Sequence, residues 1–599
     1  MKSNTTALWF VLAVTLAAAI WLLENYFQPA ATGEKPVFAG LRADHVTGIQ
    51  IIPAGAREIS VIRTNQTWLL EKPIAYPAQA VAIDGLLGAL EKLTPVMSLS
   101  AGEMSSHKNA DAEFGFDNPQ FTLDLAAGGQ TWHLRVGNKT APGDGVYVRV
   151  VGAAGALVTD TTWLQYLPHD AADWRDTALV DMPAVVDWLV ITNGTQAIEL
   201  RRDATNRLWR IVWPLPARAD NLRIVSALQQ LRAAQISRFV SDDPKADLTT
   251  YGLEPAALDV WLGSGTNLLT AIHAGKDVTG MAGEMFARRE GWNAIVATPK
   301  EPLAPWRGAV NDFRDPNLLE LTSPVAEIEV RADNNNFTLQ QHGSNGWAMV
   351  GEKFPVDPDQ VTAYIRSLAG LRIVDFVQDA LTASVLQKFG LATPSPQITL
   401  RSVAGDTNSV IAQLLFGAAT TNEVYVKRSD EASIYGLAPG ELGQISLPGD
   451  CFRAHRVWNF SETNVAQITL RQYGKIRQMI RTGTNDWSLA AGSQGIINPP
   501  AIEEAVHRLG QLDVLFWIGR KFNDAQDIGM TTNGLSVSLE LKTGEKYTVE
   551  FGKNVWLPSL KTETPLAVVT LEGERWAFIF PPVLYPLVAE ALTIPPDAP

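Results

Sequence analysis

The sequence predicts an α+β fold made of four tandem repeats of about 140 residues, each a mostly antiparallel sheet with one main helix. Three observations predict it. A turn centred on glycine occurs four times, a tryptophan at the end of a predicted strand occurs with it, and an amphipathic helix pattern follows each tryptophan. Strands accompanied by one helix in every copy are typical of an α+β design.

The glycine turn reads FGFDNP at residues 114–119, YGLEP at 251–255, FGLATP at 389–394 and, in a diverged form, IGM at 528–530. Its glycines are 137, 138 and 139 residues apart. Glycine adopts a positive φ at little steric cost and the following proline starts a new strand, so the turn is predicted to lead into a strand. The residues are Gly115, Gly252, Gly390 and Gly529, with Pro119, Pro255 and Pro394.

The tryptophan marks the strand part of each repeat. A β-type run opens the repeat, a second strand is expected to end on the tryptophan, and a proline then ends that strand because proline has no N–H for the ladder. The steps between the tryptophans are 141, 138 and 140 residues, and core packing is their expected role. The residues are Trp68, Trp209, Trp347 and Trp487, and the opening runs are 46–52, 185–192, 325–330 and 465–470.

The helix pattern is clearest in the second repeat. Asp220 is the expected N-cap, and Ile224, Leu228 and Leu231 follow at spacings of 4 and 3 on one face. A hydrophobic strand follows each helix. After the glycine turn, two strands end on a second repeated glycine. These glycines are Gly137, Gly275, Gly417 and Gly552.

An aromatic–arginine pair closes each of the first three repeats. Its arginine is the charged residue that recurs from repeat to repeat. We expect Arg175, Arg314 and Arg453 to bind carbonyl groups or a carboxylate at the junctions between repeats. Contact with a partner protein is the alternative. Asp242 and Asp243, which precede the second glycine turn, are interpreted as capping or solvated carboxylates.

These markers set the predicted domain boundaries. Repeat 1 is expected at residues 36–182, repeat 2 at 183–322, repeat 3 at 323–462 and repeat 4, a diverged C-terminal cap, at 463–599. Repetition of one unit suits an extended binding surface better than a single catalytic site.

Charge and cysteine content exclude several classes of protein. The chain has 599 residues and a formal net charge of −14, which argues against nucleic acid or an anionic membrane surface as the main partner. It has one cysteine, Cys451, so an intramolecular disulfide and a cysteine-rich metal site are impossible. A hydrophobic content of 46% and a charged content of 19% are typical of a folded protein.

Residues 1–35 are expected to form a transmembrane signal anchor and a linker, because residues 7–23 carry no charge. Lys2 precedes this run and Glu24 follows it, which predicts a cytoplasmic N-terminus and an extracytoplasmic bulk. A cleaved signal peptide is the alternative, but the small residues after the run form a poor cleavage site. A lipoprotein would need a cysteine there.

The sequence carries no recognisable catalytic motif. None of the eight histidines belongs to an HExxH or HxH pair. Gly275-Lys276 and Gly552-Lys553 lack the remaining residues of a phosphate loop. The sequence therefore predicts a protein that is not an enzyme and has no cofactor or metal.

Taken together, the tryptophan–proline–helix–strand order, the glycine turn and the apolar N-terminal segment resemble bacterial proteins that carry domain of unknown function 4340. The copies cover residues 40–590, although repeat 4 has Ile528 in place of the aromatic residue and no proline shortly after Gly529. The resemblance implies an extracytoplasmic protein anchored in the inner membrane. Such proteins are often encoded beside a gliding-motility-type ABC transporter. No catalytic residues are established for the family.

The expected function is that of a non-enzymatic accessory or scaffold component of an ABC-type transport or gliding-motility-like envelope system. The expected partners are the membrane, through residues 7–23, and other envelope or ABC-transporter proteins, but not nucleic acid. One alternative is an envelope hydrolase with a site in one diverged repeat. Another is a ligand-binding protein that feeds a transporter, which predicts a closed apolar pocket between repeats.

Overall fold

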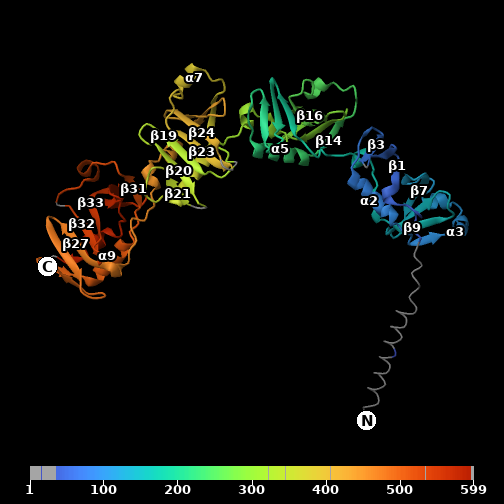
Figure 1. The fold of residues 1–599 in the computed structure, drawn as a ribbon. Coiled ribbons are helices and arrows are strands. Elements are labelled where there is room, and N and C mark those ends of the chain that lie inside the picture. The colour runs from blue at the N-terminus through green and yellow to red at the C-terminus, as the bar shows by residue number, and fades with distance from the viewer. Residues whose placement is uncertain are drawn as a thin grey trace, which may run out of the picture. The chain divides into compact units, whose positions relative to one another are not determined.

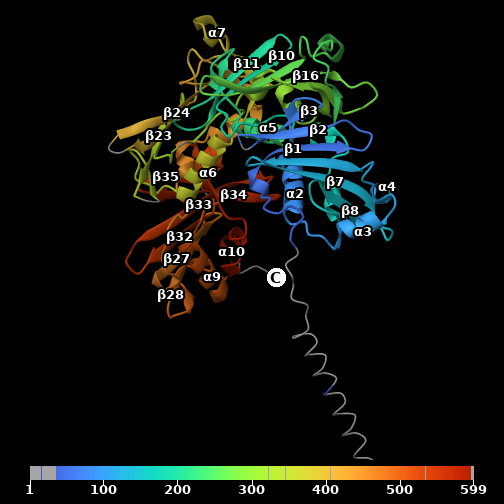
Figure 2. The ribbon, with the colours of Figure 1, turned by 90° about the vertical axis from the view of Figure 1, so that its right-hand side faces the viewer.

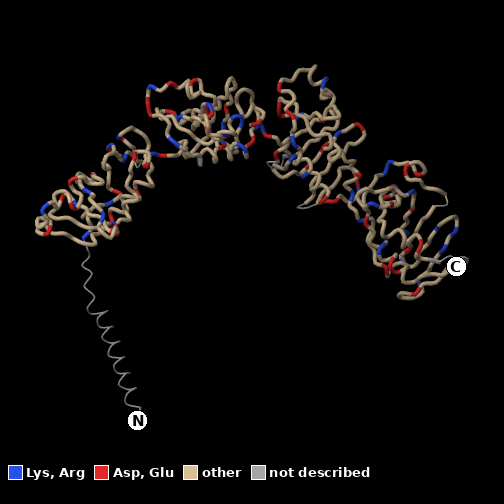
Figure 3. Tube along the Cα trace, turned by 180° about the vertical axis from the view of Figure 1, so that it is seen from behind, with Lys and Arg blue, Asp and Glu red and all other residues tan. Residues whose placement is uncertain are grey.

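The computed structural model of this chain describes Thr15 and residues 35–594, apart from residues 66, 322, 344–345, 405–406 and 533. The chain divides into two compact units, Met1–Arg314 and Asp315–Pro599, and each unit holds two repeats. Lys and Arg are interspersed with Asp and Glu along the traces of both units (Figure 3).

Repeat 1 folds into a nine-stranded sheet in the order β4-β3-β2-β1-β6-β7-β8-β9-β5 (Figure 1). Two meanders lie side by side because β1 pairs with both β2 and β6. After the main helix α2, strand β5 crosses to the far edge and pairs with β9. The elements are β1 (Val46–Pro53), β2 (Ile59–Thr64), β3 (Thr67–Lys72), β4 (Tyr76–Pro77), α2 (Ala80–Glu91), β5 (Met97–Leu99), α3 (Ala101–Ser106), α4 (Ala110–Glu113), β6 (Phe121–Ala127), β7 (Gln130–Lys139), β8 (Gly145–Val150) and β9 (Ala156–Asp160).

Repeat 2 has the same order, β13-β12-β11-β10-β15-β16-β17-β18-β14. Its central pair is β10 with β15, and β14 reaches the far edge beside β18. The elements are β10 (Trp188–Asn193), β11 (Gln196–Arg202), β12 (Trp209–Trp213), β13 (Ala217–Arg218), α5 (Asn221–Ala233), β14 (Arg238–Ser241), β15 (Leu258–Ser264), β16 (Asn267–Asp277), β17 (Glu284–Arg289) and β18 (Ile295–Pro299).

Repeat 3 has eight strands in the order β21-β20-β19-β23-β24-β25-β26-β22, which matches the first two sheets without their shortest strand. Every one of its strand pairs is antiparallel, as in the other repeats. The elements are β19 (Glu327–Arg331), β20 (Phe337–His342), β21 (Gly346–Met349), α6 (Pro358–Ala369), β22 (Ile373–Gln378), α7 (Ala383–Lys388), β23 (Gln397–Ala404), β24 (Thr407–Ala419), β25 (Val424–Arg428), β26 (Ile434–Leu437) and α8 (Pro439–Ile445).

Repeat 4 repeats the eight-stranded order as β29-β28-β27-β32-β33-β34-β35-β31 and adds a two-stranded sheet of β30 and β36. The elements are β27 (Val465–Gln472), β28 (Lys475–Arg481), β29 (Trp487–Leu489), β30 (Ile496–Ile497), α9 (Pro499–Gly510), β31 (Phe516–Gly519), β32 (Ser536–Leu541), β33 (Lys546–Leu557), β34 (Thr562–Leu571), β35 (Glu574–Ile579), α10 (Tyr585–Ala589) and β36 (Thr593–Ile594).

One amphipathic helix packs on the sheet of each repeat, and Figure 2 shows α2 and α9 against their strands. In α5 the Asp220 side chain accepts a hydrogen bond from the Arg223 N–H at 3.0 Å, so the predicted N-cap is confirmed. Ile224, Ala227 and Leu231 are buried in the core of repeat 2. Burial of this apolar face, rather than helix propensity, holds a helix of 13 residues on the sheet.

Two predictions about the fold need correction. The tryptophan does not end the second strand. It lies at or near the start of a third strand. In repeat 1, a tight turn at Asn65, with φ 49°, makes β2 and β3 a hairpin. The sequence prediction treats these two strands as one. The fold is also more β-rich than an α+β design, since strands far outnumber the one main helix of each repeat in the described part of the chain.

The transmembrane helix predicted at residues 7–23 lies outside the described residues, Thr15 excepted. Among the residues that the structure describes, no helix is both long enough and apolar enough to cross a membrane.

Candidate functional site

The two series of repeated glycines meet in one backbone contact. Gly115 has φ 80°, and the Asn138 N–H donates a hydrogen bond to the Phe114 carbonyl at 2.8 Å. A Cβ atom on Gly137 would lie 2.0 Å from that same carbonyl oxygen, so no side chain fits. In the other repeats a Cβ on Gly275, Gly417 and Gly552 would lie 2.2, 2.3 and 2.2 Å from the carbonyl oxygens of Tyr251, Phe389 and Ile528. Because no side chain fits at this contact, both glycines recur in every repeat.

The repeated tryptophans lie beneath the main helices. Trp68, Trp209 and Trp487 are buried, and Trp347 packs half-buried against its core. Pro119, Pro255 and Pro394 lie in the segments between the glycine turns and the strands that follow them. The repeated tryptophans therefore serve core packing, and the repeated prolines set the direction of the chain. Neither set of residues forms a catalytic or metal-binding group.

Arg175 is held between repeats 1 and 2. It follows a short 3₁₀ helix, η3 (Ala171–Trp174), and its side chain is 4% exposed. The guanidinium carbon lies 4.4 Å from the ring centroid of Tyr76 in repeat 1 and 3.4 Å from that of Phe239 in repeat 2. Two of its nitrogens donate to Asp242 of repeat 2 at 3.0 and 2.7 Å. Stacking and a bidentate ion pair therefore join two repeats through one side chain, which we call a clamp.

The interpretation of Asp242 as a capping or solvated carboxylate is therefore wrong. Its partner lies 67 residues away in sequence and in a different repeat, so local spacing carries no signal of the pair.

Arg453 forms a second clamp between repeats 3 and 4, after η7 (Gly449–Phe452). It is 2% exposed and lies 5.5 Å from the ring of Phe354 and 5.2 Å from that of Trp517. Its Nη2 donates to Glu572 at 3.0 Å. By strand register, Phe354 and Trp517 occupy the positions that Tyr76 and Phe239 occupy in the first clamp.

An ion-pair network surrounds the second clamp. Arg520 donates to both Glu352 oxygens at 2.9 Å, to Asp450 at 3.1 Å and to Glu574 at 2.7 Å. These carboxylates raise the pKa of the Arg520 guanidinium, the hydrogen bonds to Glu352 being the largest cause. Arg453 and Arg520 both lie over the ring of Trp576, at 4.4 and 4.9 Å.

All three arginines of the predicted junction series occupy the same backbone position. Each follows a short 3₁₀ helix. Each also forms an isolated antiparallel β-bridge with the residue two positions before the main helix of its own repeat. Arg314 is buried after η6 (Val310–Phe313) and donates to Asn311 at 3.3 Å. The bridges are Ala78 with Arg175, Ala219 with Arg314 and Val356 with Arg453.

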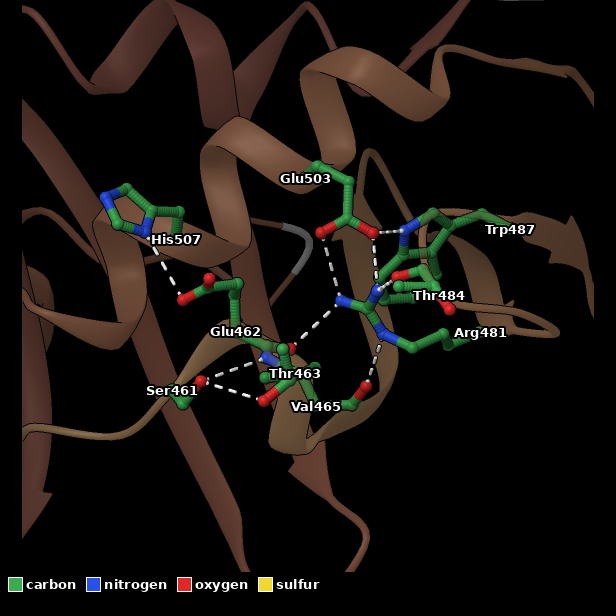
Figure 4. A network of polar contacts seen from close by, with 9 residues as sticks. All are labelled: Ser461, Glu462, Thr463, Val465, Arg481, Thr484, Trp487, Glu503 and His507. Carbon is green, nitrogen blue, oxygen red and sulfur yellow. Dashed lines mark hydrogen bonds and ion pairs between the residues drawn. The ribbon is translucent and has the colours of Figure 1, made fainter.

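A second charged cluster lies under the main helix of repeat 4 (Figure 4). Arg481 and Trp487 are cross-strand partners on β28 and β29, and Glu503 is the fifth residue of α9. Glu503 accepts hydrogen bonds from Arg481 and from the indole N–H of Trp487, the latter at 2.7 Å. Arg481 also donates to the Glu462 and Val465 carbonyls and is buried by these contacts.

Repeat 1 contains the same cluster. Arg63 pairs across the strands with Trp68, and Asp84 is the fifth residue of α2. Asp84 accepts from the Trp68 indole N–H at 3.1 Å and from Arg63 at 3.4 Å. We call this arrangement of arginine, tryptophan and helix carboxylate the triad. The sequence analysis missed it because it occurs in two of the four repeats, although an acidic fifth helix residue was a visible signal.

Comparison with known protein families identifies the chain by class. The family described as "Domain of unknown function (DUF4340)" matches residues 68–207, 209–384 and 347–536. These matches begin at Trp68, Trp209 and Trp347, so the family unit starts at the tryptophan of each hairpin. The chain belongs to this family. Comparison with curated protein sequences gives no match.

Proposed function

We propose that this protein is a membrane-anchored scaffold whose repeats present binding surfaces to an ABC-type transporter or a related envelope system. The observation that carries the proposal is the pair of clamps. Each clamp buries an arginine between two sheets, so that adjacent repeats keep a fixed relation within one unit. A protein that positions others needs such rigid spacing, whereas an enzyme needs one concave site with reactive groups.

Exposed aliphatic residues offer contact points on unit 1. Val81 and Leu222, the second residues of α2 and α5, are 81% and 85% exposed. The equivalent residue of α6 in repeat 3 is Asp359, which is exposed and charged. Apolar residues at this position favour protein contacts by repeats 1 and 2 and give a matched control in repeat 3.

Site-specific photo-crosslinking in the native host tests the proposal. A photoreactive amino acid replaces Leu222 in the full chain, and the same replacement at Asp359 is the control. We expect adducts with integral membrane subunits of a transporter from position 222 and few from position 359.

Two results would overturn the proposal. One is the absence of transporter adducts at Leu222 and Val81 together with a pull-down of the full chain that recovers no transporter subunit. The other is resistance of the repeats to external protease in intact spheroplasts, with digestion only after lysis. Repeats in the proposed extracytoplasmic location would be digested in both conditions.

A further inference from the structure

Repeat 2 lacks the carboxylate of the triad. Arg202 on β11 is the cross-strand partner of Trp209 on β12, as Arg63 is of Trp68 and Arg481 is of Trp487. The fifth residue of α5 is Val225, where α2 has Asp84 and α9 has Glu503.

The loss of this carboxylate leaves two donors open. Arg202 uses Nε to donate to the Arg207 carbonyl at 2.6 Å, and it pairs with no carboxylate among the described residues. The indole N–H of Trp209 has no hydrogen-bond partner in the described part of the chain, and its nitrogen is not among the fully buried unpaired atoms, so it remains open to solvent. In repeats 1 and 4 a single carboxylate satisfies both groups. Both donors are therefore open to an acceptor from outside, and an anion that reaches both would replace the missing carboxylate.

A cavity of about 270 Å³ opens at this position. Arg202, Arg207 and Arg232 line it, and no Asp or Glu does. Three guanidinium groups without a lining carboxylate are unusual in a chain whose net charge is −14. The rest of the lining is mostly apolar and includes Val185, Trp209, Val225 and Leu228.

We propose that this cavity binds a small organic carboxylate with a short apolar tail. Its two oxygens take the place of the Glu503 carboxylate and accept hydrogen bonds from Arg202 and from the Trp209 indole N–H. The tail lies against Val225 and Leu228, where burial of apolar surface adds to affinity. The size of the cavity limits the ligand to a small molecule or a short chain.

The chemistry of the lining selects among ligands. An ammonium group is repelled by the three arginines, and an alcohol offers no charge to them. Acetate provides the carboxylate but no tail. Hexanoate has both parts and is the probe that fits the proposal.

Isothermal titration of the full chain in a non-ionic detergent, with hexanoate as the titrant, tests it. We expect saturable binding of hexanoate with a Kd below about 1 mM, weaker binding of acetate and none of hexylammonium. Val225→Glu restores the carboxylate found in repeat 4, so we expect hexanoate affinity to fall by at least about tenfold without a loss of thermal stability. Arg202→Ala is expected to lower hexanoate affinity as well.

Two control variants separate the cavity from general effects. Val225→Thr keeps the size of the side chain without a charge, and it is expected to retain hexanoate binding. Arg63→Ala removes the equivalent arginine of repeat 1 and is also expected to retain it. Absence of hexanoate binding to the natural chain would overturn the proposal, and so would equal hexanoate binding to the Val225→Glu and Val225→Thr variants.

Discussion

The two clamps share their aromatic walls but differ in their charges. Arg175 and Arg453 each lie between one ring of the preceding repeat and one ring of the following repeat. Three residues after the following ring, repeat 2 has Asp242 and repeat 4 has Arg520. The charge at this position is therefore reversed between the two junctions.

This reversal shows which part of a clamp can change. Asp242 is the direct carboxylate partner of Arg175, whereas Arg520 cannot pair with another arginine. Arg453 takes its carboxylate from Glu572, in the turn between β34 and β35, and Arg520 binds three carboxylates of its own. The stacked arginine is common to both junctions, and the ion pair is supplied from wherever the fold brings an acidic side chain.

The largest expected effect is from loss of the stacked arginine. Arg453→Ala leaves a hole among aromatic rings and removes a buried pair, so we expect a loss of about 3 kcal/mol in the free energy of unfolding of unit 2. Arg175→Ala should have a similar effect on unit 1. Chemical denaturation monitored by hydrogen exchange of peptides from each unit gives the two values separately.

Lysine at the same position is the matched control. Arg453→Lys keeps the charge but loses the planar stacking surface and the bidentate geometry, so it should recover only part of the lost stability. Full recovery by lysine would mean that charge alone, and not the aromatic walls, holds the junction.

The repeats could be predicted because a backbone position with no room for a side chain requires glycine in every copy. A Cβ on Gly137 or Gly275 would collide with a carbonyl oxygen, so glycine recurs at this position in every repeat. The N-cap at Asp220 could be predicted for a similar reason, since its partner lies three residues away. Order and spacing of the elements follow from such local constraints.

The contacts between repeats could not be predicted in the same way. Arg175 was expected at a junction, but neither Asp242 nor the ring of Phe239 could be named, because both partners lie more than 60 residues away in sequence. The sequence likewise contains no signal that β5 crosses to the far edge of its sheet and pairs with β9. Val225 can be recognised as the position where repeat 2 lacks the triad carboxylate only after the repeats are aligned by strand register.

A charge reversal at Arg520 tests whether the two junctions are interchangeable. Arg520→Asp recreates the acidic residue of repeat 2 beside Arg453, but it also places a fourth carboxylate among Glu352, Asp450 and Glu574. We expect repulsion to dominate and the free energy of unfolding of unit 2 to fall by about 2 kcal/mol. An unchanged free energy would show that Arg453 had accepted the new carboxylate as its partner.

A smaller effect is expected from neutralising the carboxylates of the clamps. Asp242→Asn and Glu572→Gln keep a hydrogen-bond acceptor while removing the charge, and both side chains are partly exposed. We expect losses of about 1 kcal/mol, because aqueous screening weakens partly exposed pairs. Raising the salt concentration should reduce the difference between variant and natural chain, whereas a salt-independent loss would indicate a packing defect instead.

The smallest effect concerns a histidine of unit 1 that unit 2 lacks at the equivalent position. His273 hydrogen-bonds to Asp259, its cross-strand partner, and to Glu290, and the bond to Asp259 is the main cause of its raised pKa. By strand register, the equivalent pairs of unit 2 are Gln397 with Leu415 and Ser536 with Glu550.

Because the folded-state pKa of His273 lies above its ordinary value of 6.5, its contribution to stability is complete below that value. The contribution is lost as the pH rises through the raised pKa. We therefore expect His273→Asn to destabilise unit 1 by about 1 kcal/mol near pH 6 and by less near pH 9. Hydrogen exchange of peptides from β16 and β17 at the two pH values measures this, with peptides from β24 and β33 as the internal control. A difference that stays constant with pH would assign the effect to packing of the imidazole ring and not to its charge.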